Sequence, residues 1–158
     1  MCLIRKNTDT PCVATEDIVC YKVAQLRLVC VCKTGDNGEV TRIGTFTGPW
    51  WTFDYSINKE YTESNMEQGI VHDGDWMYVS KGFHTYTHLS SAEHVAYEHG
   101  FDFILECVIP KGSKFYYSYE GMERCSDRIK VTGWKYSGEL RGQRHCWHTW
   151  GVPTSYPE

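Results

Sequence analysis

Three features that would place this chain in a special class are missing. No window approaches the roughly 18 consecutive apolar residues of a membrane-spanning helix, and the start, Met1-Cys-Leu-Ile-Arg-Lys6, lacks the apolar core of a secretory signal peptide. Eight cysteines in 158 residues fall below the roughly 8–10% of a disulfide scaffold, and their spacing matches no framework. We therefore expect a cytoplasmic protein with no membrane partner, whose cysteines are mostly buried thiols.

An excess of positive charge is also missing. The 16 lysines and arginines stand against 20 aspartates and glutamates, for a net charge of -4. This balance argues against a protein that holds nucleic acid by bulk charge, although a local basic groove is compatible with it. The sequence has no internal repeat and no linker rich in proline or serine, so we expect residues 1–158 to form a single domain.

Aromatic residues, by contrast, are abundant. They make up 15% of the chain, with 6 tryptophans and 11 tyrosines. This composition favours β structure over a helical bundle. We predict an α+β, mainly β domain with a twisted, mostly antiparallel sheet and one or two short helices.

Turn residues divide the chain into short segments, and most of these have strand composition. Residues 17–23 and 26–33 are rich in β-branched residues and cysteine, and the first can run directly into the second. Residues 38–46 would form a hairpin closed by Asp36-Asn-Gly38. The polar stretch 58–68 is predicted as a loop or short helix. Residues 76–79, 113–118 and 128–134 are predicted strands, and the tail from His145 is predicted as an edge strand or packed arm.

One helix and one central strand are well marked. Ser90 followed by Glu93 forms a capping-box pattern, and Gly100 stands where a glycine ends a helix. Ala92, Val95 and Ala96 would form the apolar face between them. The near-continuous apolar run over 101–109 predicts a strand buried on both faces, with Glu106 as its single carboxylate. An unpaired buried charge costs several kcal/mol, so Glu106 must be paired, exposed or shifted in pKa.

A thiol or metal site is the weakest of the chemical hypotheses. His84 and His88 are four residues apart and His94 and His99 five, but no cysteine pair or carboxylate stands at zinc-site offsets from them. Cys30 and Cys32 are two residues apart on a predicted strand, which points both thiols to the same face, unlike the geometry of a metal knuckle. We expect no metal ligand.

The segment GFHTYTHLSSAEHVAYEHGFDFILECVIPKGSKFYYS resembles the C-terminal half of ADP-ribosyltransferase domains of the arginine-serine-glutamate type. In that family a strand carrying Ser-Thr-Ser supports the nicotinamide pocket. A short helix follows, and then a strand that carries the catalytic glutamate just before a Pro-x-Gly turn. The resemblance therefore implies a domain that binds NAD or a related nucleotide. It also implies ADP-ribosyl transfer or hydrolysis of NAD.

Under this resemblance Thr85, Tyr86 and Thr87 occupy the Ser-Thr-Ser position, with Tyr86 as a stacking residue. Glu106 would be the catalytic carboxylate. It would hold a ribose hydroxyl and stabilise an oxocarbenium-like transition state. Lys22, which follows Tyr21, would take the place of the arginine that grips the dinucleotide. The alternative is that Thr85 and Thr87 are ordinary strand residues and that Glu106 is a paired or solvated one.

The aromatic residues support a rival, non-enzymatic hypothesis. Exposed rings near arginines would stack a base or sugar, or anchor a host protein, as in a phage or bacterial accessory protein. The same rings would equally suit the core of a sandwich or barrel. The residues are Trp50, Trp51, Phe53, Tyr55, Trp134, Tyr136, Trp147 and Trp150, with Arg124, Arg128, Arg141 and Arg144.

Overall fold

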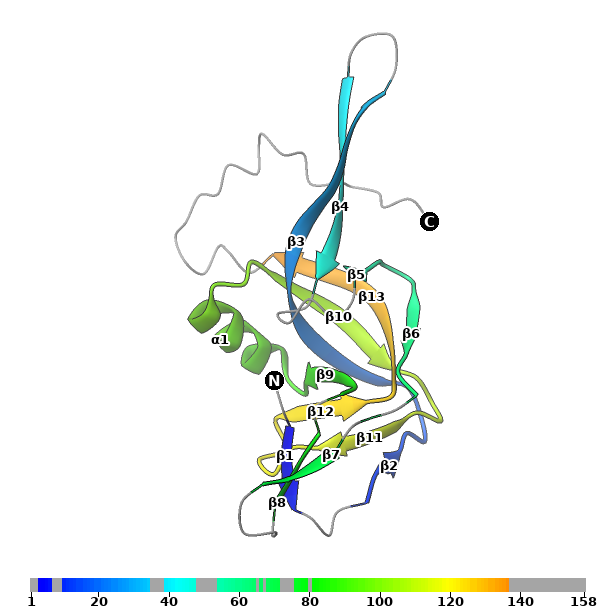
Figure 1. Cartoon of the computed structure of the whole chain (residues 1–158), viewed down its shortest axis with the longest axis vertical. Coiled ribbons are helices and arrows are strands. Elements are labelled where there is room, and N and C mark those ends of the chain that lie inside the picture. The colour runs from blue at the N-terminus through cyan, green and yellow to red at the C-terminus, as the bar shows by residue number, and fades with distance from the viewer. Residues whose placement is uncertain are drawn as a thin grey trace.

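The chain is represented by a computed structural model that describes residues 3–6, 10–34, 39–47, 54–64, 66, 68–71, 76–79 and 81–136. The described part is mainly β with one helix, as the sequence predicts (Figure 1). The strands are β1 (Leu3–Lys6), β2 (Cys12–Val13), β3 (Ile18–Thr34), β4 (Glu39–Thr47), β5 (Asp54–Tyr55), β6 (Glu60–Thr62), β7 (Gln68–Val71), β8 (Trp76–Val79), β9 (Phe83–Tyr86), β10 (Phe103–Ile109), β11 (Lys114–Tyr117), β12 (Glu123–Ser126) and β13 (Arg128–Tyr136). The helix α1 (Leu89–His99) lies between β9 and β10.

The main sheet is antiparallel throughout its described pairings. Its strand order is β2-β11-β12-β9-β3-β10-β13-β6, and β4 and β5 extend it from the far half of β3. A smaller sheet of order β1-β8-β7 lies at the end of the molecule away from the β3–β4 hairpin (Figure 1). The predicted antiparallel, mainly β architecture is confirmed.

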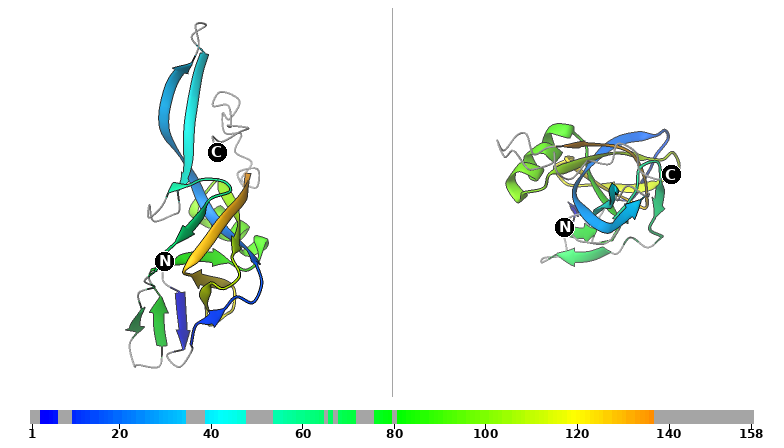
Figure 2. Two further views of the ribbon diagram at one scale, coloured as in Figure 1. Left: turned by 90° about the vertical axis from the view of Figure 1, so that its right-hand side faces the viewer. Right: turned by 90° about the horizontal axis from the view of Figure 1, so that it is seen from above.

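The long strand β3 ties the body to a projecting hairpin. Its first part pairs with β10, from Ile18 to Ala24, and its second part pairs with β4, from Gln25 to Thr34. The two predicted strands over 17–33 are therefore one continuous strand. The hairpin it forms with β4 extends well beyond the rest of the sheet (Figures 1 and 2). The predicted closing turn and the C-terminal arm from His145 lie outside the described residues.

The two faces of the main sheet carry different side chains. We call inner the face that bears Cys20, Lys22, Leu105 and Cys107, and outer the face that bears Tyr21, Val23, Ile104 and Glu106. The sheet curls around a core on its inner side, and α1 lies on its outside (Figure 2). The buried members of this core are Ala14, Cys20, Ala24, Phe46, Tyr55, Tyr61, Phe83, Phe103, Leu105, Cys107, Ile109, Phe115, Ile129 and Val131.

Helix α1 covers part of the outer face. Ala92 and Ala96 are fully buried against Val23 and Ile104, which confirms the predicted apolar face. Gly100 ends the helix in a left-handed conformation with φ of 80°, also as predicted. The predicted capping box is wrong. The N-cap is His88, which makes no side-chain cap bond, and Ser90 already lies inside the helix.

The stretch 58–68 also differs from its prediction as a loop or helix. Residues Glu60–Thr62 form β6, which pairs with β13. Tyr61 is the buried residue of this exposed-buried-exposed strand, and its ring meets that of Tyr55 edge-on at 5.2 Å. One buried ring between two polar neighbours leaves too little alternation for sequence patterning to detect a strand.

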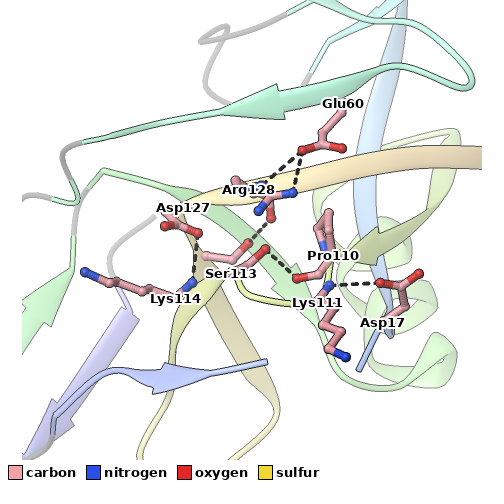
Figure 3. Close-up of polar contacts among 9 residues, drawn as sticks. Asp17, Glu60, Pro110, Lys111, Ser113, Lys114, Asp127 and Arg128 are labelled. Atoms are coloured by element: carbon pink, nitrogen blue, oxygen red, sulfur yellow. Dashed lines mark hydrogen bonds and ion pairs between the residues drawn. The ribbon is translucent and has the colours of Figure 1, made fainter. Parts of the chain in front are cut away.

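The predicted Pro-x-Gly turn after β10 is present and is held on both sides (Figure 3). Ser113 Oγ donates to the carbonyl of Pro110 at 2.6 Å, and the Lys111 amide donates to Asp17 Oδ1 at 2.8 Å. The Lys114 amide donates to Asp127 Oδ1 at 3.0 Å. The bond between Lys111 and Asp17 holds the end of β10 against the chain entering β3, and it thereby stabilises the register of these two central strands.

Candidate functional site

Strands β12, β9, β3 and β10 are consecutive neighbours, and one residue from each forms a row across them. Glu123 pairs with Tyr86, Tyr86 with Tyr21, and Tyr21 with Glu106. Directly paired residues project to the same face of an antiparallel sheet. We call these four residues the tyrosine–glutamate row. It lies on the outer face and spans about 14 Å, because neighbouring strands are about 4.8 Å apart.

The row contains two of the predicted site residues, Tyr86 and Glu106, together with two that sequence reasoning missed. Tyr21 lies in a predicted strand, but only the observed register sets it between the other two side chains. Glu123 follows the turn at Gly121, and no strand is predicted there. The short strand β12 contains one buried hydrophobic side chain, Cys125, and so lacks an alternating apolar pattern.

Lys22 and Thr85 lie on the inner face, because each is one residue away from a member of the row and strand side chains alternate. Lys22 is 8% exposed, its Nζ donates to the carbonyl of His84 at 3.0 Å, and it lies 5.5 Å from the centre of the Tyr55 ring. Thr85 is 1% exposed, and its hydroxyl lies near the thiol of Cys20. The predicted cofactor-binding residues Lys22 and Thr85 therefore do not share a face with Glu106.

Thr87 comes immediately after β9 and supports the turn between β11 and β12. Its Oγ1 donates to the carbonyl of Gly121 at 3.0 Å, and its amide donates to the carbonyl of Met122 at 2.9 Å. Thr87 thus holds this turn directly beside Glu123. In the structure it acts as a positioning residue at one end of the row.

Burial differs along the row. Tyr86 is 5% exposed, Tyr21 and Glu123 are half-buried, and Glu106 is exposed. Burial raises the pKa of Glu123, and the nearby Glu120 raises it further. Burial also raises the pKa of Tyr86, with an added contribution from the charge of Glu123. Tyr86 therefore stays a neutral phenol beside an acid that keeps its proton to higher pH than an ordinary glutamate.

Helix α1 borders the row and leaves Glu106 uncovered. Leu89, Val95 and Tyr21 pack against the buried cluster that contains Tyr86. Lys135 on β13 pairs with Glu93 of the helix at 2.8 Å. The helix starts three residues after Tyr86, and the side chain of His88 does not cap it. First-turn amides favour a negatively charged group at that end.

Gly133 on β13 faces Glu106 at a β-bulge. The β10–β13 pairing shifts register between Glu106 and Cys107, and Glu106 pairs with Gly133. A Cβ built on Gly133 would lie 3.1 Å from Glu106 Oε2. The missing side chain thus gives the Glu106 carboxylate room to lie over β13.

The change Gly133→Ala should therefore move the Glu106 carboxylate with little cost to the fold. The flexible end of Glu106 has to give by a few tenths of an ångström, and we expect the free energy of unfolding to change by about 0.5 kcal/mol or less. Carboxyl chemical shifts from NMR should change at Glu106 more than at any other glutamate. A loss of about 2 kcal/mol would instead mean that Glu106 is locked in place.

The described histidines and cysteines do not form a metal centre. Cys125 Sγ lies 3.6 Å from His84 Nε2. Within the described ranges, however, no three side chains from His, Cys, Asp and Glu are grouped so that they could hold a metal ion. Cys20, Cys107 and Cys125 are buried free thiols, as predicted, while Cys12 is exposed.

The predicted aromatic surface is only partly described, and its described members belong to the core. Tyr55 is 1% exposed, and Trp134 and Tyr136 pack on Phe103 with ring centroids 5.6 Å apart. Arg128 pairs with Glu60 at 2.9 Å, and Arg124 lies 5.1 Å from the centre of the Tyr117 ring. The remaining members, residues 50, 51, 53, 141, 144, 147 and 150, lie outside the described residues.

Comparison with known proteins adds no relative. No family model, no curated protein and no solved structure matches the chain. Among the described helical residues, no helix is long and apolar enough to cross a membrane.

Proposed function

We propose that the protein binds NAD or a related nucleotide on the outer face of the sheet, at the tyrosine–glutamate row. The observation that carries the proposal is the register that sets two tyrosines and two carboxylates side by side on one face. The half-buried ring of Tyr21 offers a face for a base or nicotinamide ring, and the two carboxylates accept hydrogen bonds from ribose hydroxyls. The uncapped start of α1 adds a place for a phosphate.

The resemblance to ADP-ribosyltransferases suggests what such a site would do. The bond between nicotinamide and ribose C1′ breaks, and its electron pair leaves with nicotinamide. A water or acceptor oxygen then attacks C1′ and loses its proton. A carboxylate beside C1′ stabilises the positive charge that develops on the ribose. Hydrolysis of NAD by this route yields nicotinamide and ADP-ribose.

The row holds two candidates for that carboxylate. Glu106 is the one that the sequence motif selects, but it is exposed, and solvent screens its charge. Glu123 is half-buried and directly opposite Tyr86, where a lower effective dielectric strengthens its action on a developing cation. We therefore place Glu123 at the reacting ribose, with Glu106 at the open end of the same row.

Binding is tested by thermal shift with NAD, ADP-ribose and, as a specificity control, a cyclic nucleotide. At a hundredfold excess over Kd, a ligand that binds only the folded state adds about 2.7 kcal/mol, which raises the Tm by about 5 °C or more for a chain of this size. Glu123→Gln should weaken the affinity measured by calorimetry about tenfold, because a hydrogen bond to a charged group is lost. The same Glu123→Gln variant should no longer release nicotinamide from NAD, as measured by chromatography.

Two further variants decide between the carboxylates. Glu98→Gln changes an exposed glutamate of α1 that pairs with His94, and it should leave affinity unchanged. Glu106→Gln should reduce affinity less than Glu123→Gln, and the reverse order would assign the reacting ribose to Glu106. A panel without any thermal shift would overturn the proposal. The exposed Tyr117, Tyr119 and Met122 around the β11–β12 turn would then be the better candidates, as a contact surface for a protein partner.

A further inference from the structure

Two free cysteines face each other across the central strands of the sheet. Cys20 on β3 and Cys107 on β10 are direct partners in the antiparallel register, and both are reduced. Directly opposed residues in such a ladder have Cα atoms about 4.5–5.5 Å apart. Disulfides span Cα separations of about 4.4–6.8 Å, so this rung has the right spacing for one.

Their surroundings separate this pair from the other described cysteines. Both side chains are 0% exposed on the inner face, between the rungs Ile18–Ile109 and Lys22–Leu105. Cys125 belongs to a different buried cluster, with Val79 and Tyr116, and Cys12 is exposed on β2. Within the described part of the chain, each member of the pair therefore has the other as its cross-strand thiol.

The backbone at Cys107 can also adapt to a cross-link. The β10–β13 ladder shifts register between Glu106 and Cys107, whereas the β3–β10 ladder continues through this point without a shift. A bulge leaves one residue outside the regular pairing and increases the local twist. The residue left out is Thr132 on β13, so Cys107 keeps its rung with Val131 beside an irregular point of the ladder, where small adjustments of β10 can be absorbed.

We propose that Cys20 and Cys107 are an oxidation site that closes to a cross-strand disulfide when the protein meets hydrogen peroxide. In the first step the sulfur of Cys20 attacks one peroxide oxygen, the O–O bond breaks, and a water leaves with the thiol proton. In the second step the sulfur of Cys107 attacks the sulfur of the resulting sulfenic acid. The S–S bond forms, the S–O bond breaks, and a second water leaves. The two thiols lose two electrons, and the peroxide gains them.

The environment selects Cys20 as the first sulfur to react. Burial raises the pKa of its thiol to about 11, while the nearby Thr85 hydroxyl and the charges of Arg124 and Lys22 act in the opposite direction. Burial raises the pKa of Cys107 well above its ordinary value, and the neighbouring Cys20 and Glu106 raise it further, against the charge of Lys22. The thiolate is the reactive form, so the reaction is slow and occurs as the core opens transiently.

The linkage is tested by peptide mapping of the folded chain in a Cys12→Ser background, so that the tryptic peptide 7–22 keeps a single cysteine. After peroxide treatment, alkylation and digestion, we expect peptides 7–22 and 82–111 to appear joined, two hydrogen atoms lighter than their sum. Dithiothreitol should separate them. The linkage should persist in Cys125→Ser and disappear in Cys107→Ala.

The melting temperature provides a second test, which needs no substitution of Cys20 or Cys107. The oxidised protein should melt several degrees higher than the reduced protein, and reduction should restore the lower Tm, because the cross-link restricts the unfolded chain. Recovery of the two peptides as separate species, alkylated or over-oxidised to sulfinic acid, would overturn the proposal. So would linkage of either cysteine to a different partner. None of these outcomes bears on nucleotide binding, so the two proposals are tested independently.

Discussion

Replacing Gly82 by alanine should cost about 3–5 kcal/mol of unfolding free energy, because backbone strain and overpacking act at the same residue. Gly82 has a φ of 123°, and a Cβ there would lie 2.5 Å from Cys125 Sγ and 3.1 Å from the carbonyl oxygen of Ser126. The backbone carbonyl belongs to β12 and cannot rotate away as a side chain does. Urea denaturation should show a lower midpoint with an unchanged slope.

Gly112→Ala is the matched control. Gly112 also has a positive φ, of 85°, but nothing lies within 4 Å of a Cβ built on it. Only the left-handed backbone then opposes the alanine, and we expect a loss of about 1–2 kcal/mol. Removing the sulfur by Cys125→Ala should make Gly82→Ala less costly than it is in the native chain, as a double-mutant cycle would show. Equal losses at Gly82 and Gly112 would contradict the steric argument.

Gly82 also bears on the site, because it fixes how β9 enters the sheet. The next residue, Phe83, pairs with Ser126, and three rungs further along Tyr86 pairs with Glu123. A shift of β9 away from β12 at Gly82 would therefore be transmitted along a short ladder to the buried end of the tyrosine–glutamate row. We expect nucleotide affinity to fall in Gly82→Ala and to be retained in Gly112→Ala.

The sequence was informative wherever the local pattern was strong. The apolar run over 101–109 predicted a central strand, and β10 lies between β3 and β13. Gly100 predicted the end of the helix for a steric reason that holds in any fold. The start of the helix was harder, because Ser90 and Glu93 match a capping box by type, while packing of Leu89 onto the sheet starts the helix two residues earlier than that box predicts.

The candidate site was less predictable, because it depends on register between strands that are distant in the chain. The motif around Thr85 and Glu106 identified β9 and β10, which lie on either side of β3 in the sheet. It did not reveal which side chains share a face. A shift of one residue moves a side chain to the other side of a sheet. Lys22 and Tyr21 are neighbours in sequence, yet only Tyr21 joins the row.

Lys22→Met provides the second large effect and separates a structural role of this amine from a ligand-binding one. Burial lowers the pKa of the Lys22 ammonium, so the folded chain holds this proton less tightly than the unfolded chain does. Replacing a buried charge by an apolar side chain of similar length should stabilise the protein by about 1–3 kcal/mol at pH 7. The loss of the hydrogen bond to the His84 carbonyl offsets part of the gain.

The stability difference between Lys22→Met and the native chain should depend on pH. Between the lowered pKa of folded Lys22 and its ordinary value of 10.5, the unfolded chain binds more protons, so the native chain gains stability as the pH rises. The advantage of Lys22→Met should therefore shrink as the pH approaches 10.5. Both chains retain Cys20 and Cys107, so subtracting their unfolding free energies removes most of the thiol titration. Lys59→Met is the control, because Lys59 is exposed beside the Tyr61 ring, and its effect should stay within about 0.5 kcal/mol.

The nucleotide affinity of Lys22→Met shows on which side of the sheet the ligand binds. Lys22 faces the inner core, on the side of the sheet opposite to the tyrosine–glutamate row, so Lys22→Met should bind NAD or ADP-ribose as the native chain does. A large loss of affinity with an intact fold would place the ligand in the interior and return Lys22 to the dinucleotide-gripping role that the family resemblance implies. Unchanged affinity together with a gain in stability at pH 7 would mean that the buried amine costs the fold stability without serving the ligand, and that binding belongs to the outer face.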